Sequence, residues 1–139
     1  MNPATIQHLV LDTNVLVMIL SERSAYHWLL QDLMNGIYQI SLTTEILLEY
    51  EEVLAAKYHR SIAQTFIASL LDLPNVHRID VYFRWNLITI DPDDNKFVDC
   101  AIAAGADVLI TEDGHFDMLK KLSFPRVPIA SLQEFTRTR

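Results

Sequence analysis

Short apolar runs that alternate with amphipathic stretches constrain the fold of this chain more than any other feature of its sequence. Runs of strand length are expected at residues 8–12, 37–41, 87–90, 108–111 and 127–130. Helices are expected at 13–20, 24–35, 45–57, 61–73, 95–104, 116–122 and from 131 onward. Strands joined through helices form parallel sheets that are covered on both faces. The sequence therefore predicts a three-layer α/β/α fold with a central parallel sheet.

Length and composition predict one compact domain over residues 1–139, because half of the 139 residues are apolar and can bury a sizeable core. The longest purely apolar run, at 15–20, is much shorter than the roughly 18 residues that cross a bilayer. The N-terminus lacks the pattern of a signal peptide. We therefore expect a cytoplasmic protein that does not bind membranes.

The formal net charge of -7 argues against a protein that binds nucleic acid through a broadly basic surface. Lys96 stands within an acidic motif, where it can pair with Asp94 or reach a phosphate, and the pattern does not decide between these. The other basic residues are expected to be solvated, including three pairs, Lys57 with Arg60, Arg78 with Arg84, and Lys120 with Lys121. Any contact with nucleic acid must therefore be local.

Two of the apolar runs end in an aspartate. Asp12 follows His-Leu-Val-Leu, and Asp113 follows Val-Leu-Ile-Thr-Glu. The carboxyl ends of parallel strands meet at one edge of a sheet, where α/β proteins bind ligands. Each acid also suits an ordinary structural role, Asp12 as the N-cap of the next helix and Asp113 as a turn residue before Gly114. Together they make this edge the first place to look for a site.

The helix expected at 95–104 contains one further acid, Asp99, among almost wholly apolar residues. An ionised carboxylate buried there costs several kcal/mol unless a cation or hydrogen bonds compensate. Periodicity also allows Asp99 to face solvent, away from the apolar side of its helix. On the helix expected at 45–57, Glu49 and Glu51 both border the apolar face, and periodicity does not choose between them.

Several segments of the chain, taken in order and with their spacing, resemble those of PIN-domain proteins. They are Leu-Asp12-Thr-Asn-Val, residues 41–54 around Glu49, Asp91-Pro-Asp-Asp94-Asn-Lys-Phe, Asp99-Cys-Ala-Ile-Ala and Ile-Thr111-Glu-Asp113. The likeness runs nearly from end to end. The segment that begins at Asp91 resembles the branch of toxin components of toxin–antitoxin pairs, the VapC-like ribonucleases. Four acids in register across one small α/β domain form a stronger signal than any single motif.

The resemblance implies that Asp12 is the central metal ligand and that Glu49, Asp99 and Asp113 complete a catalytic acidic pocket. It also favours Glu49 over Glu51. Crowded carboxylates repel one another, and a hard divalent cation with oxygen ligands relieves that repulsion. The expected cofactor is therefore Mg²⁺ or Mn²⁺.

Other positions take supporting roles from the same resemblance. Asn14 and Thr111 match polar positions that lie beside the acids and orient them or a water. Asp94 matches a further acid of this branch, but capping a helix is a sufficient role for it, so it is treated as a supporting residue. Glu112 departs from many relatives and would add negative charge near the path of the substrate. His115 is expected to be a polar turn residue, because no general-base histidine is required.

The implied function is a metal-dependent endoribonuclease that hydrolyses RNA phosphodiester bonds as the toxin of a toxin–antitoxin pair. The implied partners are an antitoxin protein and a second copy of the chain in a homodimer. One alternative is an aspartyl-phosphate phosphatase acting through Asp12, although that chemistry usually uses an acid where this chain has Asn14. The other is a catalytically weak PIN-like scaffold that acts by binding a protein, and the retention of all four acids speaks against it.

Overall fold

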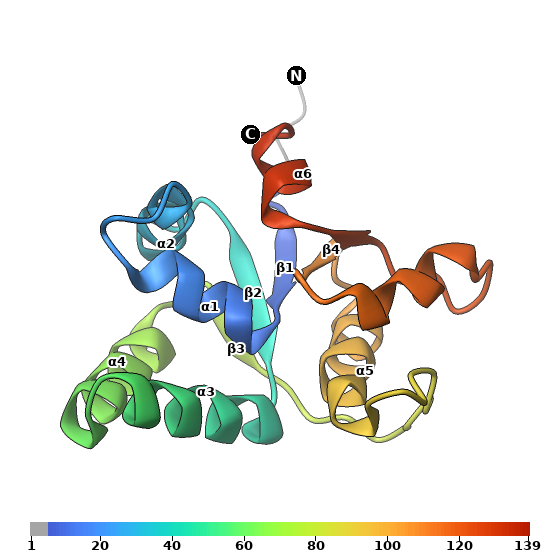
Figure 1. The fold of residues 1–139 in the computed structure, drawn as a ribbon, viewed down its shortest axis with the longest axis horizontal. Helices are drawn as coiled ribbons and strands as arrows, with labels where there is room; N and C mark the ends of the chain where they lie inside the picture. Colours follow the sequence, from blue (N-terminus) through green and yellow to red (C-terminus); the bar gives the residue numbers. More distant parts are fainter. Residues whose placement is uncertain (1–5) are drawn as a thin grey trace.

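The computed structural model describes residues 6–139, which contain a parallel sheet with the strand order β3-β2-β1-β4-β5. The strands are β1 (His8–Leu11), β2 (Gln39–Leu42), β3 (Val76–Arg78), β4 (Val108–Ile110) and β5 (Ile129–Ala130). Helices lie on both sides of this sheet (Figure 1). The predicted three-layer α/β/α fold is therefore confirmed.

The helices divide unequally between the two faces. One side holds α1 (Thr13–Leu20), α2 (His27–Met34), α3 (Thr44–Lys57) and α4 (Arg60–Asp72) (Figure 1). On the other side α5 (Asn95–Ala104) packs against β1, β2 and β4. The shorter elements are the 3-10 segments η1 (Pro92–Asp94) and η2 (Gly114–Lys121) and the helix α6 (Leu132–Thr136). Within residues 6–139, every helix is too short or too polar to cross a membrane.

The central position of β1 follows from its sequence. Leu9, Val10 and Leu11 are each at most 1% exposed, because helices cover both faces of the strand. A strand that is buried on both faces reads as a continuous apolar run, which is why β1 and β4 were predictable. Leu11 of β1 pairs in parallel with Ile110 of β4, so these two strands end side by side.

The strand predicted at residues 87–90 is wrong, and β3 at the edge of the sheet was missed. The Asn95 side chain accepts a hydrogen bond from the Ile88 N–H and donates one to the Ile88 carbonyl, each at 2.8 Å. These bonds satisfy the backbone of Ile88 without a neighbouring strand. β3 gave no apolar signal, because it is only three residues long and none of its side chains is fully buried.

Candidate active site

Asp12 and Thr111 lie side by side where the two central strands end. The Asp12 N–H donates to the Ile110 carbonyl at 3.0 Å, and Thr111 Oγ1 donates to Asp12 Oδ2 at 2.8 Å. Asp12 is 6% exposed. Burial raises the pKa of Asp12 and nearby carboxylates raise it further, against the opposing effect of the Thr111 hydrogen bond. The strand register thus places a partly desolvated carboxylate, with a raised pKa, at the edge of the sheet.

Asp113 reaches the same edge through the turn that follows β4. Its N–H donates to Thr111 Oγ1 at 3.0 Å, and its Oδ1 accepts from the His115 N–H at 2.9 Å. The second of these bonds caps the start of η2. The Thr111 hydroxyl therefore contacts both aspartates and fixes Asp113 relative to Asp12.

Glu49 arrives from the other side of β1, on α3. The Tyr50 hydroxyl donates to the Leu11 carbonyl at 2.5 Å and ties α3 to the end of β1. This contact places Glu49 beside the first turn of α1, where Thr13 Oγ1 donates to Glu49 Oε2. The structure thus brings Glu49 to the strand ends. There its carboxylate contacts the Thr13 hydroxyl and the Lys96 ammonium group, whose Nζ lies 2.8 Å from Glu49 Oε1.

Lys96 pairs with acids on both of its sides. Its Nζ lies 2.8 Å from Glu49 and 2.9 Å from an oxygen of Asp93, and only 9% of its side chain is exposed. Burial by itself would lower the pKa of Lys96, but its bonds to Glu49 and Asp93 raise the pKa above the usual value. Lys96 is therefore a charged residue held in place, and its partners are Glu49 and Asp93 rather than Asp94.

Asp94 ends η1 and faces the acids from the start of α5. Its Oδ2 lies 3.4 Å from His115 Nδ1, which is also 3.4 Å from Asp113 Oδ1. Both Asp94 Oδ2 and His115 Nδ1 are buried, and neither has a hydrogen-bond partner among the described residues. Burial, with added repulsion from Asp91, raises the pKa of Asp94 to about 6. The acids gathered here are called the acidic cluster and comprise Asp12, Glu49, Asp94 and Asp113.

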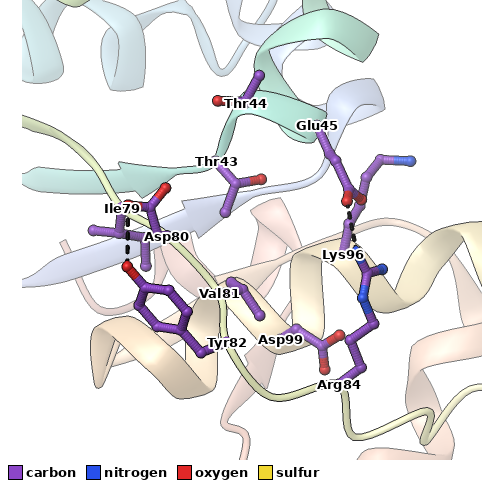
Figure 2. A pocket seen from close by; sticks show the side chains of 10 residues that line it. All are labelled: Thr43, Thr44, Glu45, Ile79, Asp80, Val81, Tyr82, Arg84, Lys96 and Asp99. Atoms are coloured by element: carbon purple, nitrogen blue, oxygen red, sulfur yellow. Dashed lines mark hydrogen bonds and ion pairs between the residues drawn. The ribbon is translucent and has the colours of Figure 1, made fainter.

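Asp99 is turned away from the acidic cluster. Its Oδ1 accepts a hydrogen bond from the Trp85 N–H at 3.1 Å, and its side chain lines a cavity near Arg84 (Figure 2). Burial raises the pKa of Asp99, while the Trp85 bond and the Arg84 charge oppose this rise. Residues five apart on a helix project about 140° apart, so Asp94 and Asp99 face different sides. The metal-ligand role expected for Asp99 stays a prediction that no contact with the cluster supports.

Of the other residues discussed from the sequence, Asn14 is exposed, whereas Glu112 and His115 contact neighbouring groups. Asn14 is exposed on α1, and the neighbouring Thr13, not singled out from the sequence, contacts Glu49. Glu112 accepts a bond from the Leu132 N–H at 2.7 Å, so its carboxylate contacts the start of α6. His115, expected to be an ordinary turn residue, lies against Asp94 and Asp113. The phase of α5 shows that Asp94 and Asp99 cannot both face one point, but it does not tell which of them faces the strand ends.

Comparisons with known proteins agree with this fold. Two solved structures share the fold, each with a TM-score of 0.62. VapBC2 from Rickettsia felis, bound to a DNA fragment from its promoter, has 16% identity over 90% of this chain and 98% of its own. DNA-bound VapBC from Salmonella typhimurium has 13% identity over 92% of this chain and 99% of its own. A search of curated proteins found no match. Residues 8–115 match the family model of the PIN domain, and the chain therefore belongs to the PIN domain family.

Proposed function

We propose that this PIN domain is a metal-dependent endoribonuclease that acts as the toxin of a toxin–antitoxin pair in the cytoplasm. The observation that carries the proposal is the acidic cluster, whose members Asp12 and Asp113 lie 101 positions apart in the chain. A stable fold gains nothing from several carboxylates brought together at partly buried positions. Their convergence at the strand ends is explained by a ligand with positive charge.

The donor set of the cluster fits a hard divalent cation. Carboxylate oxygens predominate, and the unpartnered Asp94 Oδ2 is a buried acceptor that an ion would satisfy. One ligand atom from each of Asp91, Asp94 and His115 lies within 4.8 Å of the others. We assign Asp12, Asp94 and Asp113, with Glu49, as the residues that would hold Mg²⁺ or Mn²⁺. Such an ion supplies an activated water and neutralises charge on the phosphoryl oxygens.

The surrounding side chains position the acids. Thr111 donates to Asp12, and Thr13 donates to Glu49, so each hydroxyl restrains the orientation of one carboxylate. Lys96 offsets the charge of Glu49 and restrains the Glu49 carboxylate at the edge of the sheet. These residues pre-organise the site before any substrate arrives, which lowers the cost of binding in the reactive geometry.

An antitoxin partner would have a suitable surface between α2 and α4. An apolar groove of about 490 Å³ runs between α2 and α4 and is lined by Leu30, Leu33, Met34, Ile62 and Phe66 among others. Met34 and Ile62 are 59% and 56% exposed. An amphipathic helix laid into such a groove would cover this apolar surface. We therefore propose this groove for the antitoxin, and the homodimer stays a prediction.

The proposal is tested by cleavage of a mixed-sequence single-stranded RNA. Wild type should cut the RNA with Mg²⁺ or Mn²⁺, and EDTA should stop the cutting. Glu49→Gln should lose activity, whereas Glu51→Gln, on the same helix, should retain it. Expression of wild type should slow bacterial growth, and Asp12→Asn should not. RNA that stays intact with purified, folded wild type and either metal would reject the nuclease function.

A further inference from the structure

A cavity of about 350 Å³ lies between the start of α3, the loop that contains Tyr82 and Arg84, and α5 (Figure 2). Asp80, Asp99 and Glu45 supply carboxylate oxygens to its lining and Arg84 supplies N–H donors, while the N–H groups of Lys96 are directed to Glu49 and Asp93. Asp99 Oδ1 accepts from the Trp85 N–H, and within residues 6–139 its Oδ2 has no hydrogen-bond partner. The cavity therefore offers a carboxylate acceptor near the N–H donors of Arg84, and such a pair can recognise the polar edge of a base.

Lys96 forms a wall shared by this cavity and the acidic cluster. Its side chain lines the cavity, and its Nζ bonds to Glu49 of the cluster at 2.8 Å. Asp94, which precedes α5, and Asp99, near the middle of α5, lie on the two sides of that wall. An RNA strand whose phosphodiester lies at the acidic cluster would thus place a neighbouring nucleotide within reach of the cavity.

Two arginines, Arg84 in the lining and Arg78 beside Thr44, lie at this cavity next to the acids Glu45 and Asp80, and they are the basic residues through which it can contact RNA. Arg84 pairs with Glu45 at 3.0 Å, with both side chains more than half exposed, and Arg78 donates to Thr44 Oγ1 at 2.7 Å. α3 begins between these two arginines, so its free N–H groups add partial positive charge. An exposed ion pair is weak, so Arg84 can exchange Glu45 for a phosphate at little cost.

We propose that this cavity binds one base of the RNA strand that is cut, and that it prefers a base with an exocyclic amino group. This inference rests on the proposed nuclease function. Adenine, cytosine and guanine can present an exocyclic amino group to the Asp99 carboxylate, whereas the one donor on the same edge of uracil, its N3–H, lies between two carbonyl oxygens that a carboxylate repels. Tyr82 lines the cavity and is 92% exposed, so its ring is free to stack on the base.

Cleavage of RNAs that differ only at the base next to the cut bond tests the preference. Wild type should cut the amino-bearing RNAs with kcat/KM about tenfold or more above that of the uracil RNA. Asp99→Asn should reduce this ratio to about twofold while keeping the affinity for Mn²⁺, because its carbonyl still accepts from Trp85. Tyr82→Ala should lower kcat/KM for every RNA, and Tyr58→Ala, at the far end of α3, should not. An unchanged base ratio in Asp99→Asn, or loss of Mn²⁺ binding, would overturn the proposal.

Binding of AMP, CMP, GMP and UMP to wild type, followed by NMR, separates this inference from the nuclease function. The three amino-bearing nucleotides should shift the backbone resonances of Trp85 and Arg84 more than UMP does, and Asp99→Asn should remove that difference. Shifts that fit this pattern support the cavity even if no RNA is cut. Cleavage of RNA without any such shift would support the nuclease and reject the base site.

Discussion

Asp94 precedes α5 and Asp99 follows it by five residues, near the middle of the helix, and their surroundings differ. Asp94 faces other acids and His115 and has a buried oxygen without a hydrogen bond. Asp99 accepts a backbone hydrogen bond from Trp85 and lies near Arg84. The helical rotation between them assigns one acid to the cluster and the other to a cavity behind Lys96. Two acids whose pKa values are both raised by burial can therefore have different surroundings when the phase of a helix separates them.

The largest expected effect is on RNA cleavage. Asp94→Asn should lower kcat/KM by about 100-fold or more, because it removes a charge that the cation needs. Asp99→Asn should keep cleavage of a uracil-containing RNA within about tenfold of wild type. Steady-state assays on the two purified variants check this contrast. Equal losses in both would mean that the two acids serve one site.

Metal binding should separate the same pair by a smaller factor. The magnesium ion proposed for the folded cluster would bind the unfolded chain hardly at all, so it should raise the melting temperature of wild type. The gain should shrink in Asp94→Asn and persist in Asp99→Asn. Thermal denaturation in EDTA and in millimolar Mg²⁺ measures both gains. If Mg²⁺ failed to raise the melting temperature of Asp99→Asn alone, Asp99 and not Asp94 would be the metal ligand.

Without metal, the stability of the protein should depend on pH through the cluster. Burial raises the pKa of Asp12, and it raises the pKa of Asp94 to about 6. A carboxyl with a raised pKa in the folded state stabilises the fold at low pH, and this contribution is lost as pH rises through that pKa. In EDTA, the free energy of unfolding of wild type should fall by about 1 kcal/mol between pH 5 and pH 7.

The matched variants for this pH effect are Asp94→Asn and Glu52→Gln. Asp94→Asn should flatten the pH dependence and make the metal-free protein more stable at pH 7 by about 1 kcal/mol. Glu52 is exposed on α3, so Glu52→Gln should leave the profile unchanged. Urea denaturation at several pH values gives the three profiles. A wild-type stability that rises toward pH 7 would contradict the raised pKa values.

The smallest effect is expected for the stability contribution of the ion pair at the rim of the cavity proposed to bind a base. Arg84 and Glu45 are 70% and 55% exposed, so their ion pair should add less than about 1 kcal/mol to stability. A double-mutant cycle with Arg84→Gln and Glu45→Gln measures this coupling. A larger value would show that Arg84 is fixed by Glu45 and is not free to contact RNA.

Sequence patterns predicted the centre of this fold better than its margins. β1 and β4 are buried on both faces, so their apolar runs were clear, and the acids that follow them lie where parallel strands end. The short edge strand β3 lacks such a run. No pattern could show that the Asn95 side chain replaces strand pairing at Ile88, because this contact depends on a loop conformation.

For the candidate site, sequence reasoning placed Asp12, Glu49 and Asp113 among the functional acids, and the structure brings these three together. It gave Asp99 more weight than Asp94, because a buried acid in an apolar helix is conspicuous whereas an acid at a helix start looks like a cap. The turn that precedes α5 decides which acid faces the strand ends. That turn is set by tertiary contacts rather than by periodicity.

The parallel pairing of β1 with β4 has a consequence for the chain during its synthesis. The bond between Asp12 and Thr111 joins residues that are 99 positions apart. On the ribosome, β1 emerges long before β4 is made, and until then one side of β1 has no strand to pair with. Asp94 and Asp113 also appear late in translation. The acidic cluster is therefore complete only after most of the chain has been synthesised, and an unfinished copy holds Asp12 and Glu49 without their partners.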